Sequence, residues 1–446
     1  MIPVEEHLAR ILEQIRPVET QSVPVPRAHG LVTTAEVRSR ADLPRFDNSS
    51  MDGYAVRRQD LEGASAENPV LLPVSGDVAA GDQLPREHVP GQAWRIMTGA
   101  PIPVGADAVV RVEDTDGHVR EAQFRVQPEE GSNIRRAGED VRSGEVVLPA
   151  GTPIGAPQLA ALVSAGVEQV EVVGPVRVVV LSTGDELVPV GDAVGPGQIV
   201  DSNGPMLEAL VREAGFFPVH VGHLPDDESA TKKEIKHHLD HADAIITTGG
   251  VSKGAYDIVK KVLSGEGTTE FVEVAMQPGK PQGFGVLGRR KVPVFMLPGN
   301  PVSALVSFEV FVRPALERRA GRRVSDSSTT GLVTTGWSTA KERTTYTRVR
   351  LTRDVTGEYA VEPVGGSGSH LVAGLAMADA LAVGGADEEE VAVGSQVELL
   401  LLRPRRDIDG RLSAQEDDGS DRDGDGPTDP DGPQDGDGRT DDKDGA

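Results

Sequence analysis

The stretch VRVVVLSTGDEL, residues 176–187, is the part of the sequence that most clearly indicates a fold class. It is a continuous apolar run followed at once by a polar loop that contains a glycine. NGPMLEALVREAG (203–215) has helical periodicity, with Asn203 as the expected N-cap and Gly215 as the expected C-cap. Strands that are apolar throughout and alternate with helices are typical of a parallel α/β sheet covered on both faces.

Two further strands of the same kind follow. ADAIITTGG (242–250) reads as a buried strand, and VPVFMLPGNPVSALVSFEVFVRPAL (292–316) reads as a strand, a loop and one long apolar helix. Outside this region the pattern is different. Residues 22–173 and 330–403 show short alternating runs broken by Gly and Pro, which predict β domains, the second of them a small barrel or a sandwich.

The composition limits the class of protein. A chain of 446 residues is too long for one core, and it contains no cysteine, so disulfides and thiolate metal sites are excluded. No apolar run is long enough to span a bilayer, and the N-terminus is acidic where a signal peptide would be basic, so we expect a cytoplasmic protein without a membrane partner. The net charge of -25 argues against a nucleic-acid partner.

The last 34 residues, 413–446, contain 13 acidic and 3 basic residues and almost nothing apolar, which predicts a disordered tail. Asp421, Asp423, Asp425 and Gly426 match the start of a calcium-binding loop, but its twelfth position is Gly432 and not a bidentate acid, so the match fails.

Three strand ends carry polar, glycine-containing loops: 182–186, 248–252 and 298–301. In an open α/β sheet, ligands bind beyond the carboxyl ends of the strands, and bare backbone beside a helix N-terminus offers amide donors to an anion. Neither a P-loop nor a G-x-G-x-x-G motif occurs, so tight turns without a ligand remain an alternative.

Acidic residues lie beside these loops. Glu186, Asp226 and Asp257 each follow or flank an apolar strand, and a carboxylate tolerates a bound phosphate when a cation such as Mg²⁺ bridges them. The alternative is that Asp257 only favours the positive end of its helix. Lys280, on the constrained turn QPGKP, is either an anion contact or a solvated charge. His237 and His241 have near-ligand spacing, but the surrounding charges favour a wet helix face.

Seven motifs in a fixed order strongly resemble those of the molybdopterin molybdenumtransferase family, the bacterial relatives of the gephyrin E domain. They are FDNSSMDGYAV, RIMTGAPIPVGADAVV, SNIRRAGED, STGDEL, TTGGVSKGAYD, QPGKP and LPGNPVSAL. The resemblance implies a homodimer of multidomain subunits. It also implies insertion of molybdenum from molybdate into adenylylated molybdopterin (molybdopterin-AMP), with a divalent cation and release of AMP.

The implied fold class is α/β plus β, with a parallel α/β molybdopterin-binding domain, an inserted β domain and a C-terminal β-barrel. The expected boundaries are 1–45 with 141–175 for an N-terminal linker domain, 46–140 for the inserted β domain, 176–325 for the α/β domain, 326–405 for the barrel, and 406–446 for the disordered acidic tail.

The resemblance also assigns residues, motif by motif. Glu186, Asp226 and Asp257 match acids of the pterin-phosphate and metal site, and Lys280 matches a lysine for the anionic substrate. Gly249, Gly250 and Ser252 are expected to form a phosphate cradle, and Pro298 and Pro301 to shape the third loop. A second wall of the cleft, contributed in this family by the other subunit, matches Asp52, Thr98, Arg135 and Asp140; Asp52, Asp140, Glu186 and Asp257 are the expected catalytic residues.

Many relatives have a lysine where this chain has Gln277, which keeps a hydrogen-bond donor and loses the charge. Two other functions stay open at this stage. One is the adenylyltransferase that makes the adenylylated intermediate; the other is a scaffold role similar to that of gephyrin.

Overall fold

The computed structural model describes residues 1–82, 86–224, 227–249, 258–264, 266–324, 328–353, 357–403, 405, 407–409 and 411–412. Contacts divide the chain into two compact units. One contains Met1–Val274 and Gly279–Ser325, and the other contains Ala275–Pro278 and Asp326–Ala446. Among the described helices, none has the length and apolarity that a membrane crossing requires.

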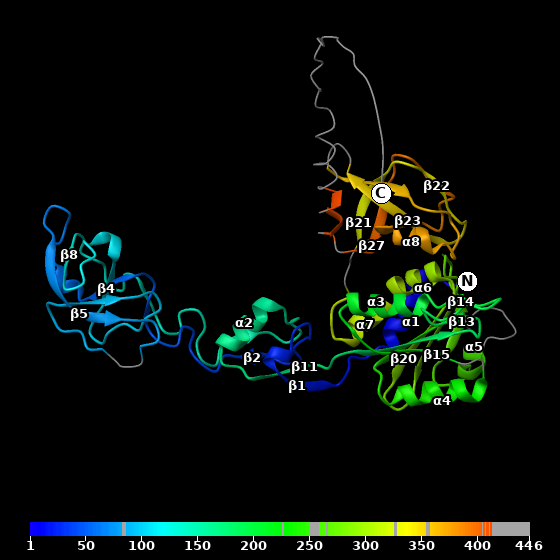
Figure 1. Cartoon of the computed structure of the whole chain (residues 1–446), viewed down its shortest axis with the longest axis horizontal. Helices are drawn as coiled ribbons and strands as arrows, with labels where there is room; N and C mark the ends of the chain where they lie inside the picture. Colours follow the sequence, from blue (N-terminus) through cyan, green and yellow to red (C-terminus); the bar gives the residue numbers. More distant parts are fainter. Residues whose placement is uncertain are drawn as a thin grey trace, which may run out of the picture. The chain divides into compact units, whose positions relative to one another are not determined.

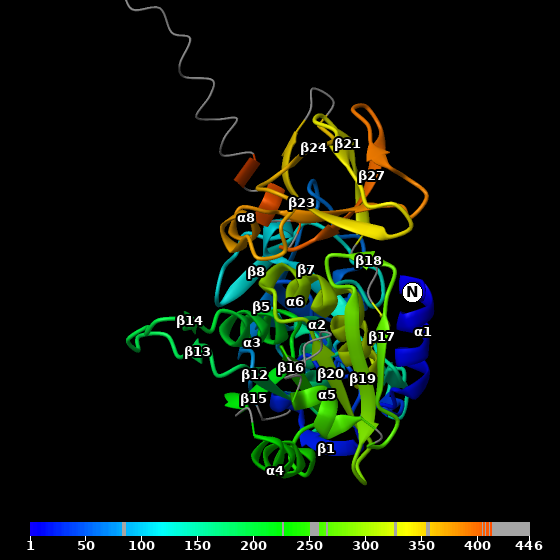
Figure 2. The same ribbon diagram turned by 90° about the vertical axis from the view of Figure 1, so that its right-hand side faces the viewer.

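A six-stranded sheet forms the centre of the α/β domain, in the order β15-β12-β16-β20-β19-β17 (Figures 1 and 2). The strands are β12 (Arg177–Thr183), β15 (Phe217–Leu224), β16 (Ala244–Thr248), β17 (Glu270–Glu273), β19 (Pro281–Leu287) and β20 (Val292–Leu297). The first four strands in this order are parallel, as the sequence predicted. Strand β19 runs antiparallel to both of its neighbours, β20 and β17, so the sheet is mixed and β19 is the strand that runs against the others. The reason is the short turn from Gly288 to Lys291, which can join β19 to β20 only as a hairpin.

Helices cover both faces of this sheet, which explains its continuous apolar strands. Helices α4 (Glu228–Leu239) and α5 (Ile258–Leu263) pack on one face, where Ile235 and Val262 join Val179 and Leu181 in one core. Helix α3 (Asn203–Glu213) packs against β12, β15 and α6 (Pro301–Ser307). Val178 and Val180, which alternate with the residues of that core along β12, are also fully buried.

The long helix expected after β20 is interrupted. Helix α6 passes into a π-helical turn, η4 (Phe308–Val312), and then into α7 (Arg313–Arg319). Pro314 has no backbone N–H to donate to the preceding turn, which accounts for the wider turn before it. Helix α1 (Val4–Gln14) packs against α7 and η4, and the ring of His7 lies edge-on to Phe311 at 4.9 Å.

The N-terminal segments pair with segments more than 100 residues away. Strand β1 (Thr20–Pro24) pairs with β11 (Gln169–Val173), and β2 (Val37–Arg38) pairs with β10 (Val146–Leu148). The short helix α2 (Ala156–Ser164) ends before Gly166, which has φ +73°. Its Leu162 is buried in a core shared with Val25 and Val172.

Between these pairs lies the inserted β domain, whose five strands have the order β7-β4-β6-β5-β8. They are β4 (Gly53–Val56), β5 (Val70–Val78), β6 (Ala93–Ile96), β7 (Ala108–Arg111) and β8 (Glu121–Phe124). Tyr54 and Phe124 pack edge-on in its core, with ring centroids 5.4 Å apart. A small additional pair joins β3 (Asn48–Ser49) to β9 (Ile134–Arg135).

The C-terminal region forms the predicted closed β-barrel (Figure 2). Its strands are β21 (Ser328–Val333), β23 (Thr344–Arg353), β24 (Tyr359–Pro363), β25 (Ala380–Gly384) and β27 (Gln396–Leu401), and pairing of β23 with β25 closes it. Strand β18 (Met276–Gln277) adds to β23, β22 (Trp337–Ser338) pairs with β26 (Glu390–Val391), and α8 is Val372–Ala376.

The barrel continues beyond the boundary predicted at residue 405. Ile408 and Leu412 are 1% and 3% exposed and belong to its core, and Arg411 pairs with Asp379 at 2.6 Å. The start of the acidic tail at residue 406 was therefore predicted too early. The sequence does not reveal this extension, because two apolar residues, Ile408 and Leu412, among charged ones give little hydrophobic periodicity. Residues 413–446 lie outside the described residues.

Candidate functional site

The three strand ends that lead into the polar loops lie side by side at the carboxyl edge of the sheet. Ser182 of β12 lies opposite Thr248 of β16, which lies opposite Leu297 of β20. Thr183 Oγ1 donates to the Thr248 carbonyl at 3.2 Å, and Thr248 Oγ1 donates to the Pro298 carbonyl at 3.2 Å. Parallel pairing therefore places three segments that are far apart in the sequence side by side, where a ligand would bind.

Gly249 occupies a position that only glycine fits. Its φ is +92°, and an added Cβ would lie 2.6 Å from Thr183 Oγ1 and 2.7 Å from the Thr183 carbonyl oxygen. Its amide donates to the Leu297 carbonyl at 3.1 Å. A bare backbone at this point lets Gly249 lie directly against Thr183, which a tight turn also requires, and its role in holding a phosphate stays a prediction.

The Asn203 side chain bridges the second and third loops, a role that the sequence did not suggest. It is the first residue of α3 and not its N-cap, because Asp201 accepts hydrogen bonds from the amides of Asn203 and Gly204, both at 3.0 Å. The Asn203 side-chain amide donates to Thr248 Oγ1 at 2.9 Å and to the Gly299 carbonyl at 2.6 Å. The signal that could have found it is D-S-N, residues 201–203, at the start of a helix that follows a strand.

Two buried oxygens at this edge have no hydrogen-bond partner among the described residues: Ser182 Oγ and Asn203 Oδ1. Ser182 is fully buried and Asn203 is 8% exposed. Unpaired buried polar atoms are costly, and in native proteins they mark places where a ligand or water completes the bonding. Within the part of the chain that the structure describes, the polar groups beneath these strand ends therefore have unused hydrogen-bonding capacity.

The predicted acids are described only in part. Glu186 is exposed. Its carboxylate lies against Gly184, because an added Cβ at Gly184 would be 2.3 Å from a Glu186 carboxylate oxygen, so the glycine leaves room for this side chain. Asp226, Gly250, Ser252 and Asp257 lie outside the described residues. Pro301 begins α6, so the third loop leads directly into a helix N-terminus.

The QPGKP turn is anchored from within the α/β domain. The buried Gln282 donates to the Gly279 carbonyl at 2.6 Å and to Ser307 Oγ at 2.7 Å, which holds the turn against α6. Lys280 is partly exposed and forms an ion pair with Glu273 at 3.0 Å. Its ammonium is therefore already engaged, and an arriving anion would have to compete with Glu273.

Gln277 has a cationic neighbour. Arg343 Nη1 donates to Gln277 Oε1 at 3.4 Å, within the unit that contains the barrel. The parallel pairing of β18 with β23 brings the two residues together. A guanidinium thus lies beside Gln277, where the family resemblance leads us to expect a lysine.

The motifs of the second predicted wall also come together. Ser49 pairs with Ile134, the amide of Gly99 donates to the Ser49 carbonyl at 2.8 Å, and the amide of Ser50 donates to the Asn133 carbonyl at 2.9 Å. Three segments separated by 30 residues or more in the sequence therefore share one edge of the inserted domain.

Within this wall, Asp52 and Thr98 form a specific pair. Asp52 Oδ1 accepts from the backbone amide of Thr98 at 2.7 Å and from its hydroxyl at 2.8 Å. These two hydrogen bonds, the one from the backbone being the stronger, hold the pKa of Asp52 below its ordinary value. Asp52 is therefore an exposed carboxylate kept ionised and fixed in direction.

Arg135 and Asp140 are both exposed. Arg135 lies on β9, the strand that pairs with β3, and Asp140 lies five residues further along the chain. The neighbouring Arg136 is committed to Asp47, at 2.7 Å, and the amide of Ala137 is the main reason that the pKa of Asp47 lies below its ordinary value. Asp140 is positioned by its backbone amide, which donates to the Leu43 carbonyl at 3.0 Å. Both adjacent arginines are exposed, and Arg136 pairs with Asp47.

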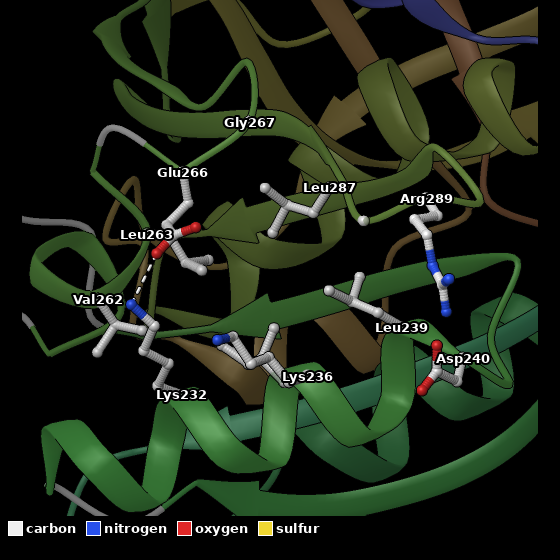
Figure 3. Close-up of a pocket in the computed structure, with 12 residues that line it drawn as sticks. Lys232, Lys236, Leu239, Asp240, Val262, Leu263, Glu266, Gly267, Leu287 and Arg289 are labelled. Atoms are coloured by element: carbon white, nitrogen blue, oxygen red, sulfur yellow. Dashed lines mark hydrogen bonds and ion pairs between the residues drawn. The ribbon is translucent and has the colours of Figure 1, made fainter.

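One described cavity of the α/β domain, of about 340 Å³, is not this site (Figure 3). It lies between α4, α5 and the end of β19, and is lined by side chains that include Lys232, Lys236, Leu239 and Leu287. Leu287 precedes the turn that enters β20, so the cavity is at the opposite end of β20 from the Pro298 loop. Lys232 is paired with Glu266 at 2.7 Å.

Three family models match consecutive parts of the chain. The MoeA N-terminal region (domain I and II) matches residues 2–166, a probable molybdopterin binding domain matches 179–318, and the MoeA C-terminal region (domain IV) matches 330–402. Together they cover the inserted domain, the sheet with its three loops, and the barrel.

Curated proteins and a solved structure are similar over most of the chain. Molybdopterin molybdenumtransferase 1 of Mycobacterium tuberculosis is 37% identical over 426 residues, which cover 90% of this chain and 99% of that protein. Molybdopterin molybdenumtransferase 2 of the same species is 45% identical over 327 residues, 72% of this chain and 80% of that protein. The structure of the molybdopterin biosynthesis MoeA protein from Pyrococcus horikosii superposes with a TM-score of 0.75 at 30% identity, covering 91% of this chain and 100% of that one.

These matches extend from the N-terminal helix through the last strand of the barrel, and they include every motif on which the resemblance was based. The chain belongs to the molybdopterin molybdenumtransferase family.

Proposed function

We propose that this protein inserts molybdenum from molybdate into the dithiolene of adenylylated molybdopterin and releases AMP. The observation that carries the proposal is the meeting of three glycine-containing loops at one sheet edge in a chain whose relatives are named molybdopterin molybdenumtransferase. In the hydrolytic step, an oxygen of water or of molybdate forms a bond to the pterin phosphate. The phosphoanhydride bond breaks, and AMP leaves with the electron pair.

The residues of the sheet edge suit an anionic substrate with polar groups. The backbone at Gly249 and Gly250, with Ser252, is proposed to hold the pterin phosphate. The unpaired Ser182 Oγ and Asn203 Oδ1 add hydrogen-bonding capacity beneath it. Lys280 supplies positive charge, and Pro298 and Pro301 shape the third loop.

The acids of this edge fit a magnesium ion. The candidate ligand atoms among the described residues are oxygens, those of the exposed Glu186 carboxylate, the Ser182 hydroxyl and the Asn203 side-chain carbonyl, and Mg²⁺ prefers oxygen ligands. We propose Glu186, Asp226 and Asp257 as its ligands; when bound, the ion would neutralise phosphate charge that a protein of net charge -25 otherwise repels.

The second wall is proposed to complete the cleft from the partner subunit of a homodimer. Its fixed carboxylate, Asp52, is ionised and held by Thr98, and the exposed Arg135 and Asp140 lie on the neighbouring segment. We also propose the cytoplasm as the compartment.

Mixed dimers test the shared cleft. Asp52→Ala and Asp257→Ala proteins, each inactive, are mixed under conditions that exchange subunits. With random exchange, about half of the dimers are mixed and each has one intact site, so about a quarter of wild-type activity should return. Complete exchange without recovery would exclude a cleft shared between subunits and leave the reaction itself untested by this experiment alone.

The reaction is tested by chromatography of AMP. Purified protein given adenylylated molybdopterin should release AMP only when molybdate and a divalent cation are both present. Asp257→Asn should lower the rate more than tenfold, a loss above about 1.4 kcal/mol of transition-state stabilisation. The matched control is Asp192→Asn, the same nearly isosteric exchange at an exposed residue of another loop. It should leave the rate unchanged.

The alternatives predict other outcomes. An adenylyltransferase would form the adenylylated compound from ATP and would not need molybdate. A scaffold would release no AMP under any metal. The family models favour neither, since the regions before and after the α/β domain match the same family as the α/β domain does.

A further inference from the structure

Three potential metal ligands gather away from the three loops, between the edge strand β15 and helix α4. They are His220 on β15, and Glu234 and His238 on α4, and one donor atom of each lies within 4.8 Å of the others. His238 Nε2 is 3.2 Å from Glu234 Oε1, and the rings of His220 and His238 have centroids 4.7 Å apart.

The local backbone explains why the three converge. Glu234 and His238 are four residues apart on α4 and therefore lie on one face of the helix. Gly222, two residues after His220, lies on the same side of β15, and a Cβ there would fall 2.4 Å from His220 Nε2. The glycine therefore leaves room for the imidazole of His220 to lie along the strand.

The three side chains differ in exposure in a way that suits a site open at the surface. The side chain of His238 is 9% exposed and fixed between the helix and the strand, whereas that of Glu234 is 42% exposed and His220 is exposed. One anchored ligand and two accessible ones leave an approach from solvent.

The donor set selects the class of metal. Two imidazoles and one carboxylate are typical ligands of zinc and related divalent transition metals, whereas Mg²⁺ prefers oxygens only. Ligands bound at about 2.0–2.2 Å lie at most about 4.4 Å from one another, so a small side-chain rotation closes the site around an ion. We propose that His220, Glu234 and His238 bind a Zn²⁺-type ion with a fourth position open to water.

Such an ion would join an edge strand to the helix that follows it. Strand β15 ends at Leu224 and α4 begins at Glu228, so the two elements flank the segment of sequence that contains Asp226. The ion would act as a clip between these elements, separate in chemistry from the proposed magnesium site.

The histidine pair noted in the sequence, His237 and His241, is not part of this set. Both are exposed, and their ring centroids are 5.6 Å apart. They are the competing site, and His241 provides the matched control, because its removal takes away an exposed histidine next to the same helix and leaves the three proposed ligands unchanged.

The test uses full-length protein without a histidine tag, freed of metal and kept in excess Mg²⁺ so that oxygen sites are filled. Zn²⁺ is titrated by calorimetry, and Co²⁺ is added in parallel because its visible spectrum distinguishes a four-coordinate site from the aqueous ion. Thermal unfolding is followed with and without Zn²⁺. The variants are His220→Gln, Glu234→Gln and the control His241→Gln; none of these changes removes the buried His238.

One ion per chain, a four- or five-coordinate Co²⁺ spectrum and a rise in Tm with Zn²⁺ are expected for wild type and for His241→Gln. His220→Gln and Glu234→Gln should weaken Zn²⁺ binding at least about tenfold and abolish the rise in Tm. Absence of binding by wild type would overturn the proposal. So would equal binding by all three variants, or loss confined to His241→Gln, which would assign the ion to the competing pair.

Discussion

At the scale of single residues, the clearest electrostatic device is the pair of hydrogen bonds from Thr98 to Asp52. Thr98→Val removes the hydroxyl and keeps the backbone donor, so the pKa of Asp52 should rise toward its ordinary value. The carboxylate would then begin to take up a proton at a higher pH than in wild type. A ¹³C NMR titration of the Asp52 carboxyl measures this, with Thr98→Ser as the control. Identical titrations of wild type and Thr98→Val would show that the hydroxyl has no influence.

Gln277 and Arg343 make a second residue-scale prediction, which depends on the proposed function. If Arg343 supplies the positive charge that Gln277 lacks, Arg343→Gln should weaken molybdate binding about tenfold, and adding Gln277→Lys should restore part of it. Lys341→Gln is the control, since Lys341 is exposed and pairs with Glu389. Calorimetric titration with molybdate gives the affinities. An unchanged affinity in Arg343→Gln would remove Arg343 from the anion site.

At the scale of elements, the junction of β16 with its loop depends on Gly249. Gly249→Ala should suffer both from its positive φ and from contact with Thr183, and should lower the Tm and the rate of AMP release. Gly191→Ala separates the two effects, because Gly191 has φ +98° but nothing within 4 Å of an added Cβ, so only backbone strain of about 1 kcal/mol is expected. Equal effects of the two substitutions would mean that the contact with Thr183 does not matter.

The attachment of α1 should depend on pH through His7. Burial, and to a smaller degree Arg10, lowers the pKa of His7 from 6.5 to about 4. Between these values the unfolded chain binds a proton that the folded chain does not, so stability falls as the pH decreases from about 6.5 to about 4, by up to about 3 kcal/mol. His7→Leu should reduce this loss, while the exposed His29→Leu should not. Denaturant titrations at pH 7 and pH 5 give the free energy of unfolding of each variant. An equal loss of this free energy between the two pH values in His7→Leu and His29→Leu would contradict the prediction.

At the scale of the whole molecule, the end of the folded chain lies later than its composition indicates. Deleting residues from Ser413 onward should leave the Tm and activity unchanged. Deleting from Asp407 onward removes the buried Ile408 and Leu412, each contributing about 1.5–3 kcal/mol, and the partners of Arg353 and Asp379. Calorimetry should then show an early transition of the barrel. A Tm equal to that of the shorter deletion would place the boundary at residue 406 after all.

The sequence by itself determined the classes of structure and the family. Continuous apolar strands such as residues 177–183 can be buried only between two layers, which indicates an α/β domain. Strands that run in parallel end at the same edge, so the strand ends that carry the glycine loops after β12, β16 and β20 were expected side by side, and they are. The seven ordered motifs pointed to the same family that the comparisons show.

Only the tertiary structure decided which side chains meet. The Asp52–Thr98 pair, the bridge from Asn203 to Thr248 and Gly299, and the cluster of His220, Glu234 and His238 join different elements. The antiparallel β19 and the residues 408 and 412 of the barrel also escaped the sequence pattern. The physical reason is common to all of them: periodicity reports which face of an element is buried, whereas strand register and helix docking determine the contacts across elements.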